Sequence, residues 1–153
     1  KVLIRNKRIS AEKNAAETSE DAPVAKYAIP NNKDMATIFS RIIAGEIPSA
    51  KVYEDETVYV FKDINPITPI HYLLIPKQHI CCAAKITPEN SAVVGHIYEV
   101  AAKIAEQEGI TDGYRIVTNC GENAGQTVFH LHFHMLAGVK MGWGADAVQP
   151  IAD

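Results

Sequence analysis

The fold is decided by the stretch His130-Leu131-His132-Phe133-His134-Met135-Leu136. Histidines alternate here with apolar residues, and a period of two is typical of a β-strand whose successive side chains point to opposite faces. The pattern predicts a strand over residues 128–137 with all three imidazoles on one face. Because the apolar side chains would then pack into the core, the histidines would form a rigid row.

Neighbouring imidazoles on this face are not expected to bond directly to each other. Positions on one face of a strand lie roughly 6.6–6.8 Å apart, which is too far for a hydrogen bond between two rings in extended geometry. A ligand is therefore expected between them. The two candidates are a metal ion, which binds neutral imidazoles, and a phosphate, which needs hydrogen-bond donors.

The residues that precede the triad favour the phosphate. Donors to an anion are available from the amides of Asn119 and Gln126, the backbone around Gly125 and the hydroxyl of Thr127. No Asp, Glu or Cys stands between positions 123 and 137 to complete the coordination of a metal. A zinc site made of three histidines is the alternative, because such a site needs no further protein ligand.

The rest of the chain predicts the elements that surround this strand. Thr37 can cap a short apolar-striped helix that ends at Gly45, and Thr87 with Pro88 can begin a long helix that ends at Gly109. Further strands are predicted over residues 51–54, 57–62, 71–76 and 114–119. Five strands with short connections and two helices predict an α+β fold with an antiparallel sheet.

Residues 1–34 differ from the remainder of the chain and are expected to form a tail outside the fold. They begin with basic residues, continue into a polar and acidic stretch, and show no apolar periodicity. Met35 directly precedes the first helical pattern. We interpret the segment as a trimmed leader, a targeting remnant or an artificial extension, and we expect the folded domain over residues 35–153.

Composition limits the kinds of partner that the chain can bind. With a formal net charge of -3 over 153 residues, it lacks the excess of basic residues that unspecific nucleic-acid binding requires. Its apolar runs are shorter than the ~18 residues of a membrane span, so we expect no membrane partner. Three cysteines do not describe a disulfide framework, which favours a reducing compartment. A cytoplasmic protein is expected, with nuclear location or organelle targeting by residues 1–34 left open.

The stretch over residues 130–136 resembles the motif of the histidine-triad family, His-φ-His-φ-His-φ-φ, where φ is apolar. The resemblance to the nucleotide-binding branch called Hint covers about residues 36–150. It includes Ile38-Phe39, Ile47-Pro48, Phe61-Lys62-Asp63-Ile64, Pro69-Ile70-His71, Ile75-Pro76-Lys77, His79-Ile80, Gly125-Gln126-Thr127-Val128-Phe129, Met141 and Trp143. The resemblance implies a symmetric homodimer in which two five-stranded sheets join into one ten-stranded sheet.

The activity that the resemblance implies is metal-independent hydrolysis of purine nucleoside phosphoramidates, adenylyl-lysine-type compounds included. AMP and GMP are the implied nucleotide ligands, and no cofactor is implied. The chemistry is sensible from the residues as well. A neutral imidazole at His132 can attack the α-phosphorus to give a nucleotidyl-histidine that water then opens, and this splits one difficult displacement into two easier steps.

The resemblance also assigns roles to residues of the site. His132 is the nucleophile, His134 contacts the phosphate, and His130 and His71 belong to a hydrogen-bond relay that supports the nucleophile. Positions that bind the phosphate or the leaving group are matched by Asn119, Gly125 and Thr127. The nucleoside shelf is matched by Asp63 and Ile64, and an apolar base pocket is matched by Ile38, Phe39, Ile42 and Phe61. Trp143 is implied to reach the partner's site.

Several of these residues have a plainer interpretation. Ile42 and Phe61 fit any apolar core, and Asp63 fits a turn beside the prolines. We expect His79 and His96 to be structural or solvated. For the whole protein, two alternatives remain open: a dinucleoside polyphosphate hydrolase of the related fragile-histidine-triad branch, and a nucleotide-binding scaffold or regulatory dimer.

Overall fold

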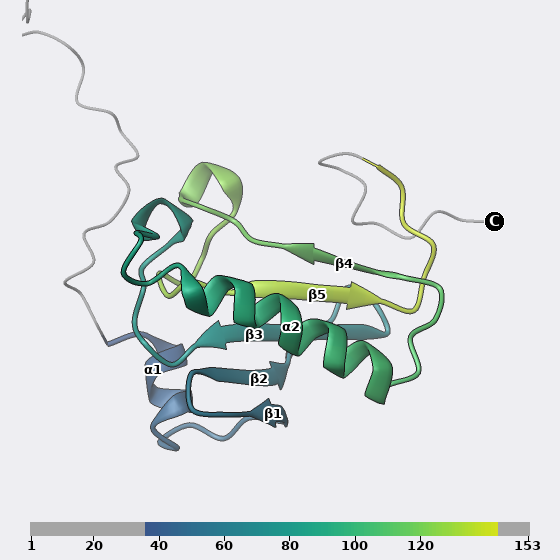
Figure 1. Cartoon of the computed structure of the whole chain (residues 1–153), viewed down its shortest axis with the longest axis horizontal. Helices are drawn as coiled ribbons and strands as arrows, with labels where there is room; N and C mark the ends of the chain where they lie inside the picture. Colours follow the sequence, from purple (N-terminus) through teal and green to yellow (C-terminus); the bar gives the residue numbers. More distant parts are fainter. Residues whose placement is uncertain (1–35, 144–153) are drawn as a thin grey trace, which may run out of the picture.

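The computed structural model describes residues 36–143. The predicted tail over residues 1–34 lies outside the described residues, and so do the last residues of the predicted domain. In chain order the elements are α1 (Ile38–Ile43), β1 (Lys51–Glu54), β2 (Val58–Lys62), β3 (Ile70–Pro76), η1 (Ala83–Lys85), α2 (Ala92–Gln107), β4 (Tyr114–Val117), η2 (Glu122–Ala124) and β5 (Phe133–Ala137) (Figure 1). Neither helix in this part of the chain is long and apolar enough to cross a membrane.

The five strands form one antiparallel sheet in the order β1-β2-β3-β5-β4 (Figure 1). The first three strands are neighbours both in sequence and in space, because short connections let consecutive antiparallel strands pair. The chain then crosses the sheet in α2, forms β4 at the edge, and returns as β5 between β4 and β3. The predicted α+β fold with a five-stranded antiparallel sheet and two helices is confirmed.

The two helices pack on opposite faces of the sheet. Leu74 of β3 belongs to the core cluster that includes the apolar side of α2, and α2 lies across that face in Figure 1. Leu73 and Ile75 point the other way and pack against Phe39 and Ile42 of α1. Because side chains alternate along a strand, His71 lies on the α1 face of the sheet.

The long helix begins later than predicted. Thr87 and Pro88 lie in a turn, and α2 starts at Ala92. In this turn the Thr87 carbonyl accepts from Asn90 N at 3.1 Å and from Ser91 N at 2.9 Å, while Asn90 Oδ1 accepts from Thr87 N at 2.7 Å. The side chain of Asn90 thus closes the turn on itself, and such local bonds compete with a continuous helix.

The last strand is shorter than the predicted range of residues 128–137, because β5 begins only at Phe133. If the register of β3 and β5 continued, Leu131 would lie opposite Pro76. A proline has no N–H and cannot extend the ladder of hydrogen bonds. The Pro76 carbonyl instead accepts from Nε2 of His130 at 2.7 Å. The first two triad histidines therefore lie in a segment that leads into the strand.

The end of β5 packs closely against the loop before β3. Gly138, which directly follows β5, has φ +90°, and a Cβ atom added there would lie 3.0 Å from Cβ of Pro69. Positive φ is strained for any residue with a side chain, and a contact of 3.0 Å requires a neighbour to move. A glycine is therefore needed at this point for the chain to pass Pro69.

Replacing Gly138 by alanine should lower the free energy of unfolding by about 2–4 kcal/mol, the sum of the positive-φ cost and the cost of overpacking. Gly45→Ala is the matched control, because Gly45 has φ +77° and no atom within 4 Å of an added Cβ. We expect this control to lose only about 1 kcal/mol. Urea unfolding followed by circular dichroism measures both, and equal losses would show that the Pro69 contact is unimportant.

Candidate active site

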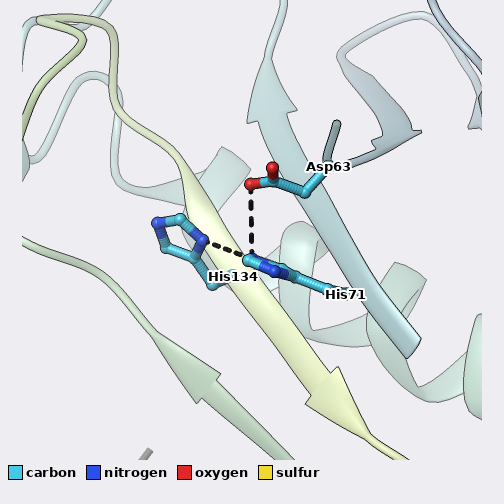
Figure 2. Close-up of side chains that lie close together, drawn as sticks. All are labelled: Asp63, His71 and His134. Carbon is cyan, nitrogen blue, oxygen red and sulfur yellow. Dashed lines mark hydrogen bonds and ion pairs between the residues drawn. The ribbon is translucent and has the colours of Figure 1, made fainter. Parts of the chain in front are cut away.

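Neighbouring strands bring two histidines of the site together. His71 of β3 pairs with Leu136, and Leu73 pairs with His134 of β5, so both imidazoles lie on the same face. His71 Nε2 and His134 Nδ1 are 2.8 Å apart, which is a hydrogen bond (Figure 2). His71 Nδ1 accepts a further bond from the backbone N–H of Ile67 at 3.1 Å.

Asp63 joins this pair from the end of β2. Its Oδ2 lies 3.4 Å from His71 Nε2, as Figure 2 shows, while its Oδ1 accepts from Asn65 N at 2.8 Å. The second bond is that of an Asx turn, which the plainer interpretation of this residue predicted. Asp63 therefore both closes the turn and faces the histidines, and its contact with a ribose stays a prediction.

His132 has a defined proton position. Its Nδ1 lies 2.7 Å from the carbonyl oxygen of His130. Because a carbonyl can only accept, Nδ1 carries the hydrogen and a neutral ring keeps its lone pair on Nε2. Thr118 Oγ1 donates to the carbonyl of His132 itself at 2.8 Å, so the backbone of this residue is also held. The tautomer is the one that a nucleophile at Nε2 requires.

The hydrogen bonds divide the predicted relay into two parts. His130 supports His132 through its backbone carbonyl, while its ring donates from Nε2 to the carbonyl of Pro76. His71 bonds to the ring of His134 and to no other histidine. The predicted support of His132 by His130 therefore runs through a backbone carbonyl, and a link from His71 to His132 stays a prediction.

Burial keeps the triad neutral. It lowers the pKa of His130 to about 4 and that of His134 to about 4, and it lowers the pKa of His132 below the ordinary value of 6.5. The negative charge of Asp63 acts against this shift at His132 and His134. Phe39 contributes to the burial, since its ring lies 5.1 Å from that of His132 and 6.2 Å from that of His130.

The other two histidines, His79 and His96, lie in different surroundings. His79 packs edge-on against His130 with ring centres 5.1 Å apart, and burial lowers its pKa. Its two ring nitrogens are buried without a hydrogen-bond partner among the residues that the structure describes. His96 is partly exposed on α2 and bonds to Asp55 at 2.6 Å and to Glu99 at 2.9 Å. His96 is thus partly solvated, as expected, and the structural role expected of His79 stays a prediction.

Gln126 does not serve as the predicted donor to an anion. Only 3% of its surface is exposed, and its amide nitrogen donates to the carbonyls of Cys81 and Val128 at 2.9 and 3.1 Å. Its amide oxygen accepts from Gly121 N at 2.8 Å. Both ends of the amide are therefore used inside the protein, where they join the loop before the triad to the segment after β3.

The remaining predicted phosphate ligands lie in the same loop. A Cβ atom added at Gly125, which has φ +82°, would lie 3.8 Å from Nδ2 of Asn119, so these two positions are adjacent. Thr127 is exposed and follows the buried Gln126. Asn119 is partly buried, Gly125 and Thr127 are exposed, and the contact of these residues with a phosphate stays a prediction.

The predicted nucleoside pocket divides into buried and exposed members. Phe39, Ile42 and Phe61 are at most 7% exposed and form one core cluster with residues of β2 and β3. Ile38 and Ile64 are 49% and 89% exposed. The plainer interpretation of Ile42 and Phe61 as core residues is thus confirmed, and base binding by this group stays a prediction.

The C-terminal end of the described chain leaves Trp143 almost fully exposed, at 99%. Arg115 of β4 donates to the carbonyl of Gly142 and so ties this end to the edge of the sheet. Contact of Trp143 with a partner subunit stays a prediction.

A metal ion does not fit the cluster of Asp63, His71 and His134 as its rings are bonded. Within residues 36–143, ligand atoms of Asp63, His71 and His134 lie within 4.8 Å of one another, which is the spacing of a metal site. A histidine that binds a metal normally donates from its other ring nitrogen. The other nitrogen of His71 accepts from Ile67 N, so the nitrogen that faces the cluster carries a hydrogen. The alternative zinc site made of the three triad histidines stays a prediction.

Backbone groups are the members of the site that the sequence analysis missed. The Ile67 N–H and the carbonyls of His130 and Pro76 each fix a histidine ring. No side-chain type signals such a role. Thr118 could have been found, because a hydroxyl on the strand expected beside the triad is a natural donor to its backbone.

A known protein family matches most of the chain. The family described as "Scavenger mRNA decapping enzyme C-term binding" matches residues 36–147. A HIT-like protein of Synechocystis is 50% identical over 107 residues, which are 70% of this chain and 94% of that protein. The purine nucleoside phosphoramidase of Escherichia coli K12 is 48% identical over 107 residues, 69% of this chain and 90% of that protein.

Solved structures show the same likeness. A HIT family hydrolase from Legionella pneumophila superposes with a TM-score of 0.70 at 39% identity, over 72% of this chain and 99% of that one. A histidine triad protein from Clostridium difficile superposes with a TM-score of 0.68 at 45% identity, over 70% of this chain and 94% of that one.

The role of Gln126 in holding the loop can be tested by Gln126→Leu. The variant removes the three hydrogen bonds that the Gln126 amide makes to the backbone of Gly121, Cys81 and Val128, and we expect a loss of about 2–5 kcal/mol in the free energy of unfolding. Thr127→Val is the control in the same loop, because this exposed side chain should contribute little to stability. Urea unfolding measures both. Unchanged stability in Gln126→Leu would contradict the structural role and restore this amide as a candidate ligand.

Proposed function

The chain belongs to the histidine-triad (HIT) family, and we propose that it hydrolyses the P–N bond of purine nucleoside phosphoramidates through a nucleotidyl-histidine on His132. The observation that carries the proposal is the bond from His132 Nδ1–H to the carbonyl of His130 at 2.7 Å, which leaves a lone pair on Nε2. The 48% identity to a protein named purine nucleoside phosphoramidase supports the choice of substrate.

In the first step the Nε2 lone pair of His132 attacks the α-phosphorus. A bond forms between Nε2 and phosphorus, the P–N bond breaks, and the amine leaves with the electron pair of that bond and gains a proton. The ring becomes an imidazolium that still carries its hydrogen on Nδ1. The carbonyl of His130 stabilises this cation, because its oxygen faces the Nδ1–H along which the positive charge is spread.

In the second step water attacks the same phosphorus. The bond from phosphorus to Nε2 breaks, its electron pair returns to the ring, and one proton of the water passes to the solvent. The products are the nucleoside monophosphate and neutral His132. Two displacements on one nucleophile replace a single difficult attack by water on an amidate.

The other predicted ligands complete the proposed site. The loop that contains Asn119, Gly125 and Thr127 would offer donors to phosphoryl oxygens, where charge develops during both steps. Asp63 and the exposed Ile64 would receive the ribose of AMP or GMP. Burial of the triad supports this chemistry, since an attacking imidazole has to be neutral.

We further propose a symmetric homodimer. Among the five strands β4 pairs with β5, so β4 lies at an edge of the sheet. A free strand edge favours pairing with another strand, and a second β4 across a two-fold axis would join two sheets into one of ten strands. Trp143 stands on the same side of the fold as the Arg115 of this strand, because Arg115 bonds to the preceding residue, Gly142.

Replacing His132 by alanine should abolish turnover of adenosine 5′-phosphoramidate, with a loss of several orders of magnitude in kcat, because the covalent route is lost. Intact-mass spectrometry after brief mixing should detect an adenylyl adduct on the wild type and none on the variant. His96→Gln is the control, since this partly exposed histidine on α2 lies outside the site. Near-normal turnover by His132→Ala would remove His132 from the role of nucleophile.

The pH dependence of kcat/KM should show an acid limb below pH 6.5. The pKa of His132 is lowered by burial, so the ring stays neutral through neutral pH and activity falls only as pH drops through the lowered pKa. Stability falls over the same range. Histidines of the unfolded chain bind protons near pH 6.5, while His130 and His134 of the folded chain stay neutral to about pH 4, so acid favours unfolding.

Initial rates should therefore be measured together with circular dichroism, and only pH values at which the chain stays folded should be used. An acid limb centred at or above pH 6.5 in the folded protein would contradict a buried nucleophile with a lowered pKa.

A further inference from the structure

We propose that the backbone N–H of Ile67 sets the proton of His134 by way of His71, so that His134 donates a hydrogen bond to the phosphoryl group and never a proton. Of these three residues, only His134 would contact the substrate and so be catalytic, whereas Ile67 and His71 would be positioning residues. The position of the phosphate beside His134 depends on the proposed function, whereas the proton positions depend on the hydrogen bonds alone.

The argument begins at the first bond of the series. The N–H of Ile67 lies 3.1 Å from Nδ1 of His71, and a backbone N–H can only donate. Nδ1 of His71 therefore holds a lone pair, and the hydrogen of the neutral ring is on Nε2. A second proton on this ring would set an N–H against the N–H of Ile67. Burial also lowers the pKa of His71, although Asp63 acts in the opposite direction.

The second bond passes this polarity on. His71 Nε2–H donates to Nδ1 of His134 at 2.8 Å, so Nδ1 of His134 holds a lone pair as well. The single hydrogen of His134 is then on Nε2, which points away from His71 in Figure 2. The ring of His132 is also a neighbour of His134, with ring centres 5.1 Å apart.

The two neighbouring rings thus receive opposite tautomers from opposite kinds of backbone group. The carbonyl of His130 leaves a lone pair on Nε2 of His132, and the amide of Ile67 places a hydrogen on Nε2 of His134. A nucleophile and a hydrogen-bond donor stand side by side. This is the combination that attack on a phosphoryl group needs, because negative charge develops on the oxygens while the bond forms.

The same bonds prevent His134 from acting as a general acid. A neutral imidazole that gives up its one hydrogen becomes an anion, and a buried site disfavours that charge. Double protonation, which would supply a proton to give, is opposed by burial, and the pKa of His134 lies near 4. The leaving amine therefore has to gain its proton from water or from the substrate itself.

The proton positions can be measured directly in the full chain without substrate. Nitrogen-15 NMR of histidine-labelled protein should show the Nε2–H tautomer for His71 and His134 and the Nδ1–H tautomer for His132. Ile67→Pro removes the donor N–H, and we expect His71 and His134 to shift to a mixture of tautomers. Ile67→Ala keeps the N–H and is the matched control, since the Ile67 side chain is 50% exposed.

Turnover gives a second readout on the same pair of variants. We expect Ile67→Pro to lower kcat about tenfold with little change in KM. Complete loss of a hydrogen-bond donor to the transition state lowers kcat roughly 10²–10³-fold, and a mixture of tautomers loses this donor only in part. Ile67→Ala should stay within about twofold of the wild-type kcat. Should Ile67→Pro fail to fold, the wild-type spectrum still decides. An Nδ1–H tautomer at His134 in the wild type, or unchanged tautomers in folded Ile67→Pro, would overturn the proposal.

The claim that His134 gives no proton is tested by the leaving group. His134→Ala should slow an aniline-derived and an alkylamine-derived adenosine phosphoramidate by the same factor. A much larger loss for the alkylamine, which leaves only with a proton, would identify His134 as a general acid and refute the proposal. If neither compound is a substrate of the wild type, the proposed function fails, while the NMR result stands by itself.

Discussion

The site depends on one constraint: a backbone carbonyl can only accept a hydrogen bond, and a backbone N–H can only donate one. The carbonyl of His130, the carbonyl of Pro76 and the N–H of Ile67 each meet a histidine ring at 2.7–3.1 Å. A neutral imidazole can carry its hydrogen on either nitrogen, and these three contacts determine which of the two tautomers each ring adopts. The chain path therefore determines the chemistry that each ring can perform.

Burial makes this choice effective. The α1 face of the sheet is covered by Phe39 and its neighbours, and within this cover the lowered pKa values keep the rings neutral. A charged ring would carry hydrogen on both nitrogens, and the distinction between tautomers would vanish. The arrangement has an energetic cost, since ring nitrogens of His79 and His130 are buried without a partner among residues 36–143.

Sequence patterns predict the parts of this protein that depend on side-chain character. The strands, the two helices and the clustering of His71, His132 and His134 follow from periodicity and from the family resemblance, and the structure agrees. The patterns fail where the backbone decides. Pro76 shortens β5, Asn90 delays α2, and Gln126, which resembles an exposed donor, is buried between carbonyls. Backbone N–H and carbonyl groups are the same for nearly every residue type, so a sequence pattern does not reveal which of them bond to the histidines.

The bond from Ile67 to His71 has a consequence for how such proteins vary in evolution. A contribution made by a peptide N–H is indifferent to the side chain that follows it, so this position is free to drift among nineteen residue types and closed to proline alone. The side chain of Ile67 is half exposed, so packing constrains the residue type at this position only weakly. Alignments of side chains would count the position as unimportant, although its N–H determines which nitrogen of His134 carries the hydrogen.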